Sequence, residues 1–311
     1  MSTFGSVNVM IRVGIVGFDT SHAVEFTKRI NHFNVDSGFW VEGARIVAGY
    51  PGEPTPAASQ ELLDERTEIL RNYDVEIVES PLSLIGMVDA VMIEYNEGDK
   101  HLEASRPFIE AGLPVFIDKP LACSVQDAKK IFELAEASSV PILSASSLRY
   151  ALEVQRLKES KDEVGDVLGA STYSPGTIVQ FNPGLFFYVI HAIELLYALI
   201  GKGCQSVRCY SDDRWDVIVG RWTDGRVGIV RGIRSGAKGY GFTAFCERKI
   251  ISSAIDTSWI YTELLKRIIE MFKTRKPSVD PAETLEIIAF TEKAMESNRL
   301  NREVKVENRL T

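Results

Sequence analysis

The stretch "FIDKPLA" at residues 116–122 places a lysine directly after a short apolar run that is typical of a buried strand. In open parallel sheets, ligands bind beyond the carboxyl ends of the strands, so a side chain leaving such a strand faces a crevice. Pro120 fixes its own φ and favours an extended backbone at Lys119. We therefore expect Lys119 to project a cation into the crevice. From these residues alone, a solvated lysine in a surface turn is an equally good interpretation.

A second stretch, "VGIVGFDTSH" at residues 13–22, begins like the strand-to-helix turn of a dinucleotide-binding fold. Such a turn normally reads Gly-x-Gly-x-x-Gly, whose glycines let the backbone approach a pyrophosphate. Here Gly17 is followed by Asp19 at the second glycine position and by His22 at the third. Repulsion between the Asp19 carboxylate and a phosphate at about 4 Å would cost on the order of 1–4 kcal/mol.

The start of the following helix offsets this penalty in part, because its free backbone N–H groups favour an anion. Three residues of the loop are also good N-caps, so the Asp19 side chain can turn to cap the helix. We therefore expect the loop to bind phosphate still. The expected cofactor-contacting residues of this loop are Gly17, Phe18, Asp19, Thr20 and Ser21.

Two further strand ends add polar residues near the crevice. The second strand ends at "AGYPGEP", with Tyr50 where a ribose-binding acid is expected. No arginine follows closely to receive a 2′-phosphate, which favours NAD over NADP. The fourth strand ends at "IEYNEGDKH", with Glu94 and Asn96 beside the crevice.

Four residues near these strand ends have side chains that can bind a metal ion: Asp19, His22, Glu94 and His101. No close-spaced pair such as H-E-x-x-H supports a metal site, and we expect none. We expect His22 to cap the first helix or to pack against it.

The first half of the chain alternates between apolar runs and amphipathic segments. Apolar runs predict strands at 11–17, 44–50, 89–95, 114–118 and 141–147. Helical patterns lie between them, at 21–33, 101–112 and 124–138. In the last helix, Ser124 and Asp127 are typical of a capping box. Apolar strands joined by helices indicate a parallel sheet that is covered on both faces. We predict a Rossmann-like, doubly wound α/β domain over residues 1–148.

The second half, residues 149–311, is predicted to be an α+β domain with a mainly antiparallel sheet. Its predicted elements are a strand at 167–175, a helix at 184–201, a hairpin within 215–233 and amphipathic helices at 260–272 and 285–295. His191 and Glu194 interrupt the apolar run 184–201, which favours a buried core helix over a membrane span. The dipeptide Asp224-Gly225 is a strong hairpin signal.

Composition and charge exclude several classes of protein. A chain of 311 residues fits two domains, and its net charge of −8 argues against nucleic-acid binding. No apolar run approaches the roughly 20 residues of a membrane span. The first residues lack the basic start and apolar stretch of a signal peptide, so we expect a cytoplasmic protein. The four cysteines form no C-x-x-C pair, and we interpret them as buried free thiols.

Five motifs in order resemble those of the Gfo/Idh/MocA oxidoreductases, the family of glucose-fructose oxidoreductase and inositol dehydrogenase. The segment "DKPLA" is similar to the family's Glu-Lys-Pro-Leu-Ala, with Asp118 in place of glutamate. "YVIHAIELLYALIG" resembles the family's Gly-x-His-x-x-Asp helix, with His191 and Glu194 at the histidine and acid positions. The other three motifs are "VPI" followed by Arg149-Tyr150, "EVGDVLGA" at 163–170 and the tail 283–306. The resemblance covers nearly the whole chain.

The resemblance implies hydride transfer between a sugar or cyclitol hydroxyl and NAD or NADP. Oxidation of an alcohol needs a base within hydrogen-bond reach of the hydroxyl, and histidine accepts a proton at neutral pH. A lysine ammonium beside the same oxygen stabilises the developing alkoxide. His191 is thus implied as the catalytic acid/base and Lys119 as its electrostatic partner. Asn96, Asp118 and Lys119 are implied to contact the cofactor.

A sugar or polyol ligand needs aromatic faces and polar groups around it. The expected substrate residues are Arg149, Tyr150, Tyr188 and Glu194. The family's aspartate four residues before the histidine is replaced by Phe187, so Tyr188 or Glu194 would have to substitute for it. The resemblance also implies a homodimer or homotetramer that is built through the C-terminal sheet.

Two other functions remain open. A cofactor-less carbohydrate-binding or regulatory protein that keeps the fold would account for Asp19, Phe187 and the missing ribose acid. A redox-neutral enzyme with tightly bound NAD is the other alternative, because a fold by itself does not fix a reaction.

Overall fold

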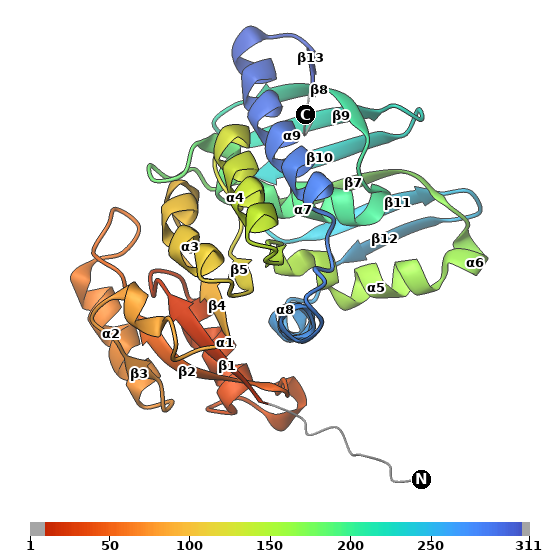
Figure 1. Ribbon diagram of the computed structural model, residues 1–311. Helices are drawn as coiled ribbons and strands as arrows, with labels where there is room; N and C mark the ends of the chain where they lie inside the picture. The colour runs from red at the N-terminus through yellow and green to blue at the C-terminus, as the bar shows by residue number, and fades with distance from the viewer. Residues whose placement is uncertain (1–9, 307–311) are drawn as a thin grey trace.

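The computed structural model describes residues 10–306 and places them in two domains, each built around one sheet (Figure 1). The first sheet has six strands in the order β3-β2-β1-β4-β5-β6. The second has seven strands in the order β12-β11-β7-β10-β9-β8-β13. The predicted fold class, a Rossmann-like α/β domain followed by an α+β domain, is confirmed.

All strand pairs of the first sheet are parallel. Its strands are β1 (Ile11–Val16), β2 (Ala44–Tyr50), β3 (Glu76–Ile77), β4 (Ala90–Ile93), β5 (Val115–Ile117) and β6 (Ile142–Leu143). Every residue of β4 and β5 is buried, as both faces of the sheet are covered by helices. The strand order places a crevice at the carboxyl ends of β1 and β4, where the winding reverses direction.

Four helices belong to the first domain: α1 (His22–Asn31), α2 (Gln60–Arg71), α3 (His101–Glu110) and α4 (Val125–Ala137). Helices α1 and α2 contribute to the core on one face of the sheet, and α3 and α4 to the core on the other. The predicted cap of α4 is confirmed, because the Asp127 N–H donates to Ser124 Oγ at 3.1 Å. Helix α2 and strand β3 were not predicted.

The second sheet is antiparallel except for the parallel pair β7 and β10. Its strands are β7 (Val167–Pro175), β8 (Cys204–Ser211), β9 (Trp215–Trp222), β10 (Val227–Ile233), β11 (Gly241–Cys246), β12 (Ile250–Ala254) and β13 (Val304–Lys305). The predicted turn Asp224-Gly225 joins β9 to β10, and Gly225 has a φ of 90°, which glycine adopts readily.

The helices of the second half are α5 (Leu152–Glu159), α6 (Lys161–Val164), α7 (Val189–Ile200), α8 (Ile260–Thr274) and α9 (Pro281–Leu300). Short 3-10 turns are η1 (Ser37–Phe39), η2 (Pro81–Leu84), η3 (Gly98–Lys100), η4 (Ser147–Tyr150) and η5 (Gly184–Phe186). The helix predicted over 184–201 therefore divides into η5 and α7. Helix α7 packs against β7 and β10, in the core of the second domain.

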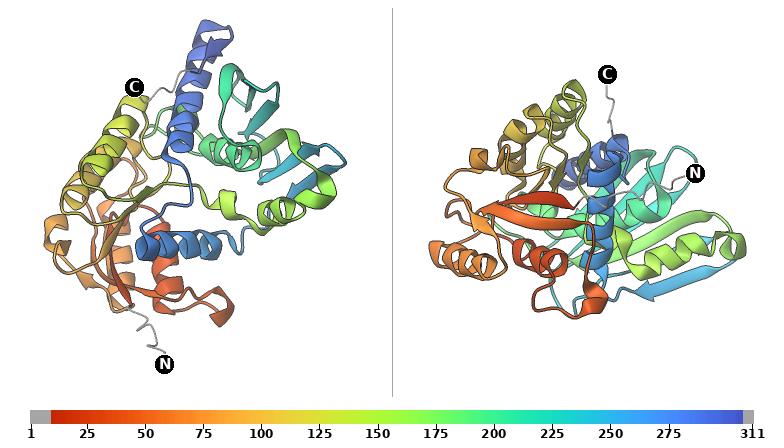
Figure 2. Two further views of the ribbon diagram at one scale, coloured as in Figure 1. Left: turned by 45° about the vertical axis from the view of Figure 1, so that its right-hand side comes forward. Right: turned by 60° about the horizontal axis from the view of Figure 1, so that its bottom comes forward.

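Helix α8 packs against α1 although the two lie far apart in the sequence (Figure 2). Its buried residues Leu265, Ile268 and Ile269 belong to the same core as Val24 of α1. The domain boundary at residue 148 stays a prediction, and a helix from beyond it completes one face of the first domain.

The four cysteines are free thiols, as the sequence predicts. Cys123, Cys204 and Cys209 are buried, whereas Cys246 is only partly covered. The expectation of burial is therefore wrong for Cys246, which is the last residue of β11, next to the edge strand β12.

Within residues 10–306, no helix combines the length and the apolar character that crossing a membrane requires. The expectation about a signal peptide concerns the first residues of the chain, and residues 1–9 lie outside the part that the structure describes.

Candidate functional site

A cleft of about 360 Å³, called the central cleft below, lies at the carboxyl ends of the parallel strands. The first domain lines it with residues that follow β1, β4 and β5, and with part of α2. Residues of η4 at the predicted domain boundary line it as well, and the second domain adds residues of α7 and α8 and of the loops before α7 and β11. Its polar and aromatic lining includes Asp19, Thr20, Ser21, His22, Arg66, Asn96, Lys119, Tyr188, His191, Tyr240 and Tyr261.

Lys119 and His191 both line the central cleft, from opposite domains. Lys119 follows β5 and is largely buried, with its Nζ 5.7 Å from the ring centroid of Phe187. His191 lies in the first turn of α7, and its Nδ1 is 2.7 Å from Oγ of Ser146. This contact fixes the imidazole ring and leaves Nε2 for another partner.

The imidazole of His191 is neutral at physiological pH. Burial lowers the pKa of His191 well below its usual value, and the nearby Lys119 charge lowers it further. A neutral imidazole can accept a proton, and the ammonium of Lys119 can stabilise an oxyanion in the same cleft.

The loop after β1 turns its two unusual side chains into the protein. Phe18 is fully buried, and a Cβ on Gly49 of β2 would lie 2.7 Å from its Cζ. Asp19 is 3% exposed, and its Oδ2 accepts the N–H of Asn96 at 2.9 Å. Nδ2 of Asn96 donates in return to the Asp19 carbonyl at 2.7 Å. The Asp19 side chain therefore does not cap α1 but ties the β1 loop to the loop after β4.

Burial raises the pKa of Asp19 to about 6, even though the bond from Asn96 and the charge of Lys100 act in the opposite direction. Arg66 of α2 donates to the Phe18 carbonyl at 2.7 Å and adds a cation to the lining. Gly17 has a φ of 90°, and a Cβ there would meet the Tyr95 ring at 2.8 Å, so this position requires glycine.

The start of α1 differs in detail from the expected caps. Ser21 occupies the N-cap position but makes no side-chain capping bond. Oγ1 of Thr20 instead accepts the N–H of His22 at 3.1 Å. Thr20 and Ser21 line the central cleft next to this helix start, where a positive partial charge favours an anion.

A cluster of three ionisable side chains, called the His22 cluster, lies beside the cleft. Nδ1 of His22 is 2.8 Å from Oδ2 of Asp118 and 3.7 Å from Oε2 of Glu94. Burial disfavours charge on His22, but the Asp118 carboxylate outweighs it and raises the pKa of His22 to about 9. Burial raises the pKa of Glu94 to about 8. The expected packing of His22 on its helix is confirmed by its stacking on Phe26 at 4.9 Å.

The sequence did not single out this grouping. The sequence analysis named four residues that can bind a metal ion, and the structure brings only His22 and Glu94 of them together. Asp118 completes the His22 cluster. His101 is fully buried, and its two ring nitrogens lie 2.9 and 2.8 Å from the carbonyl oxygens of Tyr95 and Pro120. Asp118, which was expected to contact a cofactor, is buried, and its Oδ2 lies 2.8 Å from Nδ1 of His22.

Of the four residues expected to contact substrate, only Tyr188 lines the central cleft. Arg149 is buried; its Nε donates to Glu194 at 3.0 Å and its Nη1 to Glu283 at 2.6 Å. The Tyr150 hydroxyl is 2.6 Å from Oγ of Ser278. The side chains of Arg149, Tyr150 and Glu194 are thus occupied in joining η4 to α7 and to the segment around the start of α9.

Sequence reasoning missed several residues of the cleft. Arg66 lies on the unpredicted α2, and Tyr240 lies in a loop without a motif. Tyr261 belongs to the helix that was correctly predicted over 260–272, but the apolar pattern of that helix assigned it only a core role. Nothing in the pattern indicated that α8 reaches the first domain.

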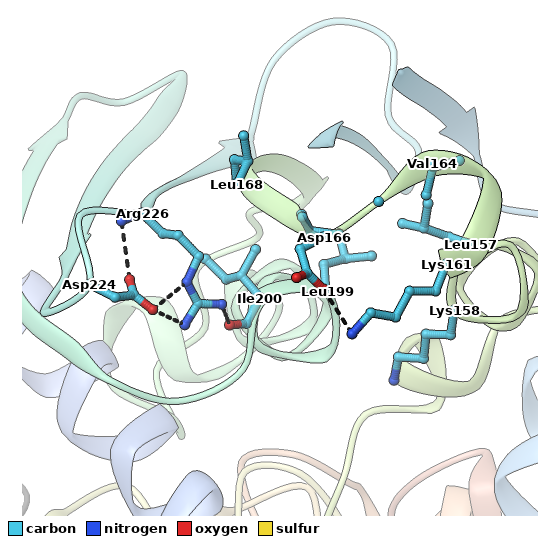
Figure 3. A pocket seen from close by; sticks show the side chains of 12 residues that line it. Leu157, Lys158, Lys161, Val164, Asp166, Leu168, Leu199, Ile200, Asp224 and Arg226 are labelled. Carbon is cyan, nitrogen blue, oxygen red and sulfur yellow. Dashed lines mark hydrogen bonds and ion pairs between the residues drawn. The ribbon is translucent and has the colours of Figure 1, made fainter. Parts of the chain in front are cut away.

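A larger hollow of about 590 Å³ lies between α5, α6, β7 and the end of α7 (Figure 3). Its charged residues are mostly paired with each other: Lys161 with Asp166 at 2.8 Å, and Arg226 with Asp224 at 2.7 Å. None of the residues that the sequence singled out for chemistry lines it. The central cleft is therefore the candidate site.

Comparisons with known proteins bear on the family and the fold. Residues 11–146 match the family described as "Oxidoreductase family, NAD-binding Rossmann fold" (GFO_IDH_MocA). A segment of 74 residues is 31% identical to the uncharacterized protein YMR315W of Saccharomyces cerevisiae, covering 24% of this chain and 21% of the yeast protein. The match thus spans only about a fifth of the length of that relative.

Solved structures share the fold over nearly the whole chain. A probable dehydrogenase from Thermotoga maritima superimposes with a TM-score of 0.77 at 19% identity, over 95% of this chain and 99% of that one. The scyllo-inositol dehydrogenase of Lactobacillus casei, solved with NAD(H) and scyllo-inositol, gives a TM-score of 0.78 at 15% identity, over 96% and 99%.

Proposed function

We propose, from the premise that this chain belongs to the Gfo/Idh/MocA oxidoreductase family, that it is an NAD-dependent dehydrogenase acting on a hydroxyl of a sugar or polyol. The observation that carries the proposal is that Lys119 and His191 line one cleft from opposite domains. A cation and a neutral proton acceptor in one cleft are the two groups that alcohol oxidation requires.

The residues of the cleft fit a dinucleotide. The lining runs from Leu62 and Arg66 of α2, past the start of α1, to His191 of α7, so an extended ligand would contact both domains. The Phe18 side chain is packed inward, whereas Asp19 is largely buried and lines the cleft beside Thr20 and Ser21. Thr20 and Ser21 would hold the diphosphate at the helix start, and Lys119 would lie at the end that faces the second domain.

Bound NAD supplies the hydride acceptor, and the chain's own residues handle the proton. The neutral His191 accepts the proton of the substrate hydroxyl at Nε2, while Ser146 holds the ring through Nδ1. Lys119 stabilises the negative charge that develops on the same oxygen. Tyr188 and Tyr240, which line the cleft next to His191, offer aromatic faces to a polyhydroxylated ring.

The class of substrate rests on the family and on neighbours such as the scyllo-inositol dehydrogenase. Since Arg149 and Glu194 are bound to each other, substrate selection falls to residues that line the cleft. The aspartate that Phe187 replaces has no carboxylate substitute among these lining residues apart from Asp19. We infer that aromatic contacts and Lys119 orient the substrate here.

Titration of the purified protein with NAD+, NADH and NADPH tests the proposal. We expect a micromolar dissociation constant for NAD(H), seen in nicotinamide fluorescence, and a thermal stabilisation that corresponds to a few kcal/mol at saturation. The absence of any shift with all three nucleotides would support the cofactor-less alternative. Binding that survives gel filtration would instead support the redox-neutral alternative.

A further inference from the structure

We propose that His22, Glu94 and Asp118 form a binding site for a divalent transition-metal ion of the zinc class. The three residues come from the start of α1, the end of β4 and the end of β5, which the parallel sheet brings to one point. The site adjoins the central cleft through His22, but its occurrence does not depend on the proposed dinucleotide function.

The geometry of the His22 cluster suits three-point coordination. One ligand atom from each residue lies within 4.8 Å of the other two, with Nδ1 of His22 2.8 Å from Asp118 and 3.7 Å from Glu94. Tetrahedral metal bonds of about 2.0–2.2 Å place neighbouring ligand atoms about 3.3–3.6 Å apart. His22 and Asp118, which are 2.8 Å apart in a hydrogen bond, would therefore move slightly apart as the ion replaces the proton between them. The three ligands can therefore be reached with small side-chain adjustments.

The environment of Glu94 gives the strongest support for a metal ion at this point. Its side chain is fully buried, and neither carboxylate oxygen accepts a hydrogen bond from any residue that the structure describes. The nitrogen that approaches it is Nδ1 of His22, whose closer contact is with Asp118. A buried carboxyl group without a donor is destabilising, and a metal ion that displaces the proton of His22 would bind both carboxylates at once.

The side-chain types select the class of metal. Mg²⁺ and Ca²⁺ prefer oxygen ligands only, whereas an imidazole with two carboxylates suits Zn²⁺, Mn²⁺, Fe²⁺ or Co²⁺. Two carboxylates also balance the double charge of such an ion. The backbone N–H of Lys119 donates to Oδ1 of Asp118 at 2.8 Å and so orients that carboxylate.

A metal ion can reach the site from solvent, and the imidazole ring of His22 is held in place by neighbouring aromatic rings. His22 lines the central cleft, and its side chain is 13% exposed, so an ion can enter along the imidazole. The ring is held by Phe26 at 4.9 Å and by Tyr261 at 5.1 Å. Three protein ligands leave at least one coordination position for water from the cleft, as in metal sites that bind exogenous ligands.

The test is a Co²⁺ and Zn²⁺ titration of the full-length protein after treatment with a chelator. We expect one equivalent of Co²⁺ to give visible ligand-field bands that Zn²⁺ abolishes. Glu94→Gln and, separately, His22→Gln should each weaken binding at least about 100-fold, because even the loss of an outer-shell partner costs 10–100-fold. The matched control is His32→Gln, which removes a histidine lying 3.5 Å from the exposed Glu42 and should leave binding unchanged.

Two results would overturn the proposal, one from the wild-type protein and one from the Glu94→Gln variant. Absence of saturable, stoichiometric Co²⁺ binding, or identical bands in folded Glu94→Gln protein, would show that the cluster holds protons rather than a metal. Circular dichroism identifies any variant that fails to fold. NAD binding is measured in the same samples, so a failed metal titration with intact NAD binding leaves the proposed function standing.

Discussion

Asp19 occupies the position of the second glycine in a glycine-rich loop. Its buried environment should affect both the stability of the protein and its affinity for the cofactor. The carboxylate is bound to Asn96, and its Oδ1 is buried without a partner among residues 10–306. The folded state holds a proton on Asp19 more tightly than the unfolded chain, because burial raises the pKa from 3.8 to about 6.

The first prediction is a gain in stability from Asp19→Asn that depends on pH. A raised carboxyl pKa stabilises the folded state below pH 4, and this contribution disappears as pH rises through 6. A shift of about two units is worth about 3 kcal/mol. The asparagine side chain of the variant resembles the protonated acid, so the free energy of unfolding should rise by up to this amount at pH 8 and little at pH 4. Equal changes at both pH values in urea denaturation would contradict the assignment.

The second prediction concerns the cofactor. Because the Asp19 carboxylate lies beside the expected diphosphate position, its removal in Asp19→Asn should tighten NAD+ binding, by about tenfold for a relief of about 1.4 kcal/mol. Wild-type protein should likewise bind NAD+ more tightly at about pH 5.5 than at pH 8, and the variant should lose this dependence. Calorimetric titration measures both, and a weaker or unchanged affinity in the variant would place the diphosphate elsewhere.

Lys119 and His191 were singled out by the family motifs that contain them, whereas residue types alone left Lys119 equally well explained as a surface lysine. Neither motifs nor residue types could show which polar groups satisfy one another. Arg149 and Glu194 have the types of a sugar-binding pair, yet Arg149 binds both Glu194 and Glu283. Such pairing depends on distances across the fold, which no short motif contains.

Helix α8 belongs to the second half of the sequence, yet it packs against the first domain. Periodicity was sufficient to predict the helix and its apolar face. The partner of that face could not be predicted, because an amphipathic helix has the same pattern against any core. In the structure the face covers α1 and supplies Tyr261 to the central cleft.

A third prediction follows from this packing. Ile268 is fully buried in the core shared with the first domain, so Ile268→Ala should lower the free energy of unfolding by about 2–5 kcal/mol. Leu82 of η2 is 56% exposed, and Leu82→Ala should change it by no more than about 0.5 kcal/mol. Similar values for the two variants would show that α8 does not pack as described.

The division of the predicted helix 184–201 into η5 and α7 could not be predicted from the apolar pattern either. Phe187 and Tyr188 lie between η5 and α7, and both line the central cleft. The residues around this break, 184–190, are apolar or aromatic throughout and give no signal for it. The break places aromatic rings, rather than a continuous helix, beside Lys119.

At the scale of the whole molecule, the second sheet leaves apolar side chains uncovered. Large hydrophobic residues on its strands are 42–68% exposed: Tyr210, Val227, Phe245 and Ile250. We propose that this sheet pairs with that of a second copy, since exposed apolar surface of this kind marks an interaction site.

The fourth prediction is an assembly larger than the 34.6 kDa chain in sedimentation equilibrium. Phe245→Glu places a charge on the sheet and should shift the protein toward the monomer. Leu82→Glu changes an exposed residue of the first domain, away from the second sheet, and should not alter the mass. A wild-type monomer at concentrations of tens of micromolar would exclude pairing through the sheet.

The central claim is that Lys119 and His191 act on one substrate oxygen in the cleft between the domains. It is tested most directly by following NADH formation from NAD+ with a panel of inositols and sugar alcohols, in wild-type and Lys119→Ala protein. We predict turnover with at least one polyol, a kcat about 100-fold or more lower in the variant, and a much smaller change in the dissociation constant for NAD+. Equal turnover in the two proteins would contradict the claim, as would NAD+ binding without turnover on any member of the panel.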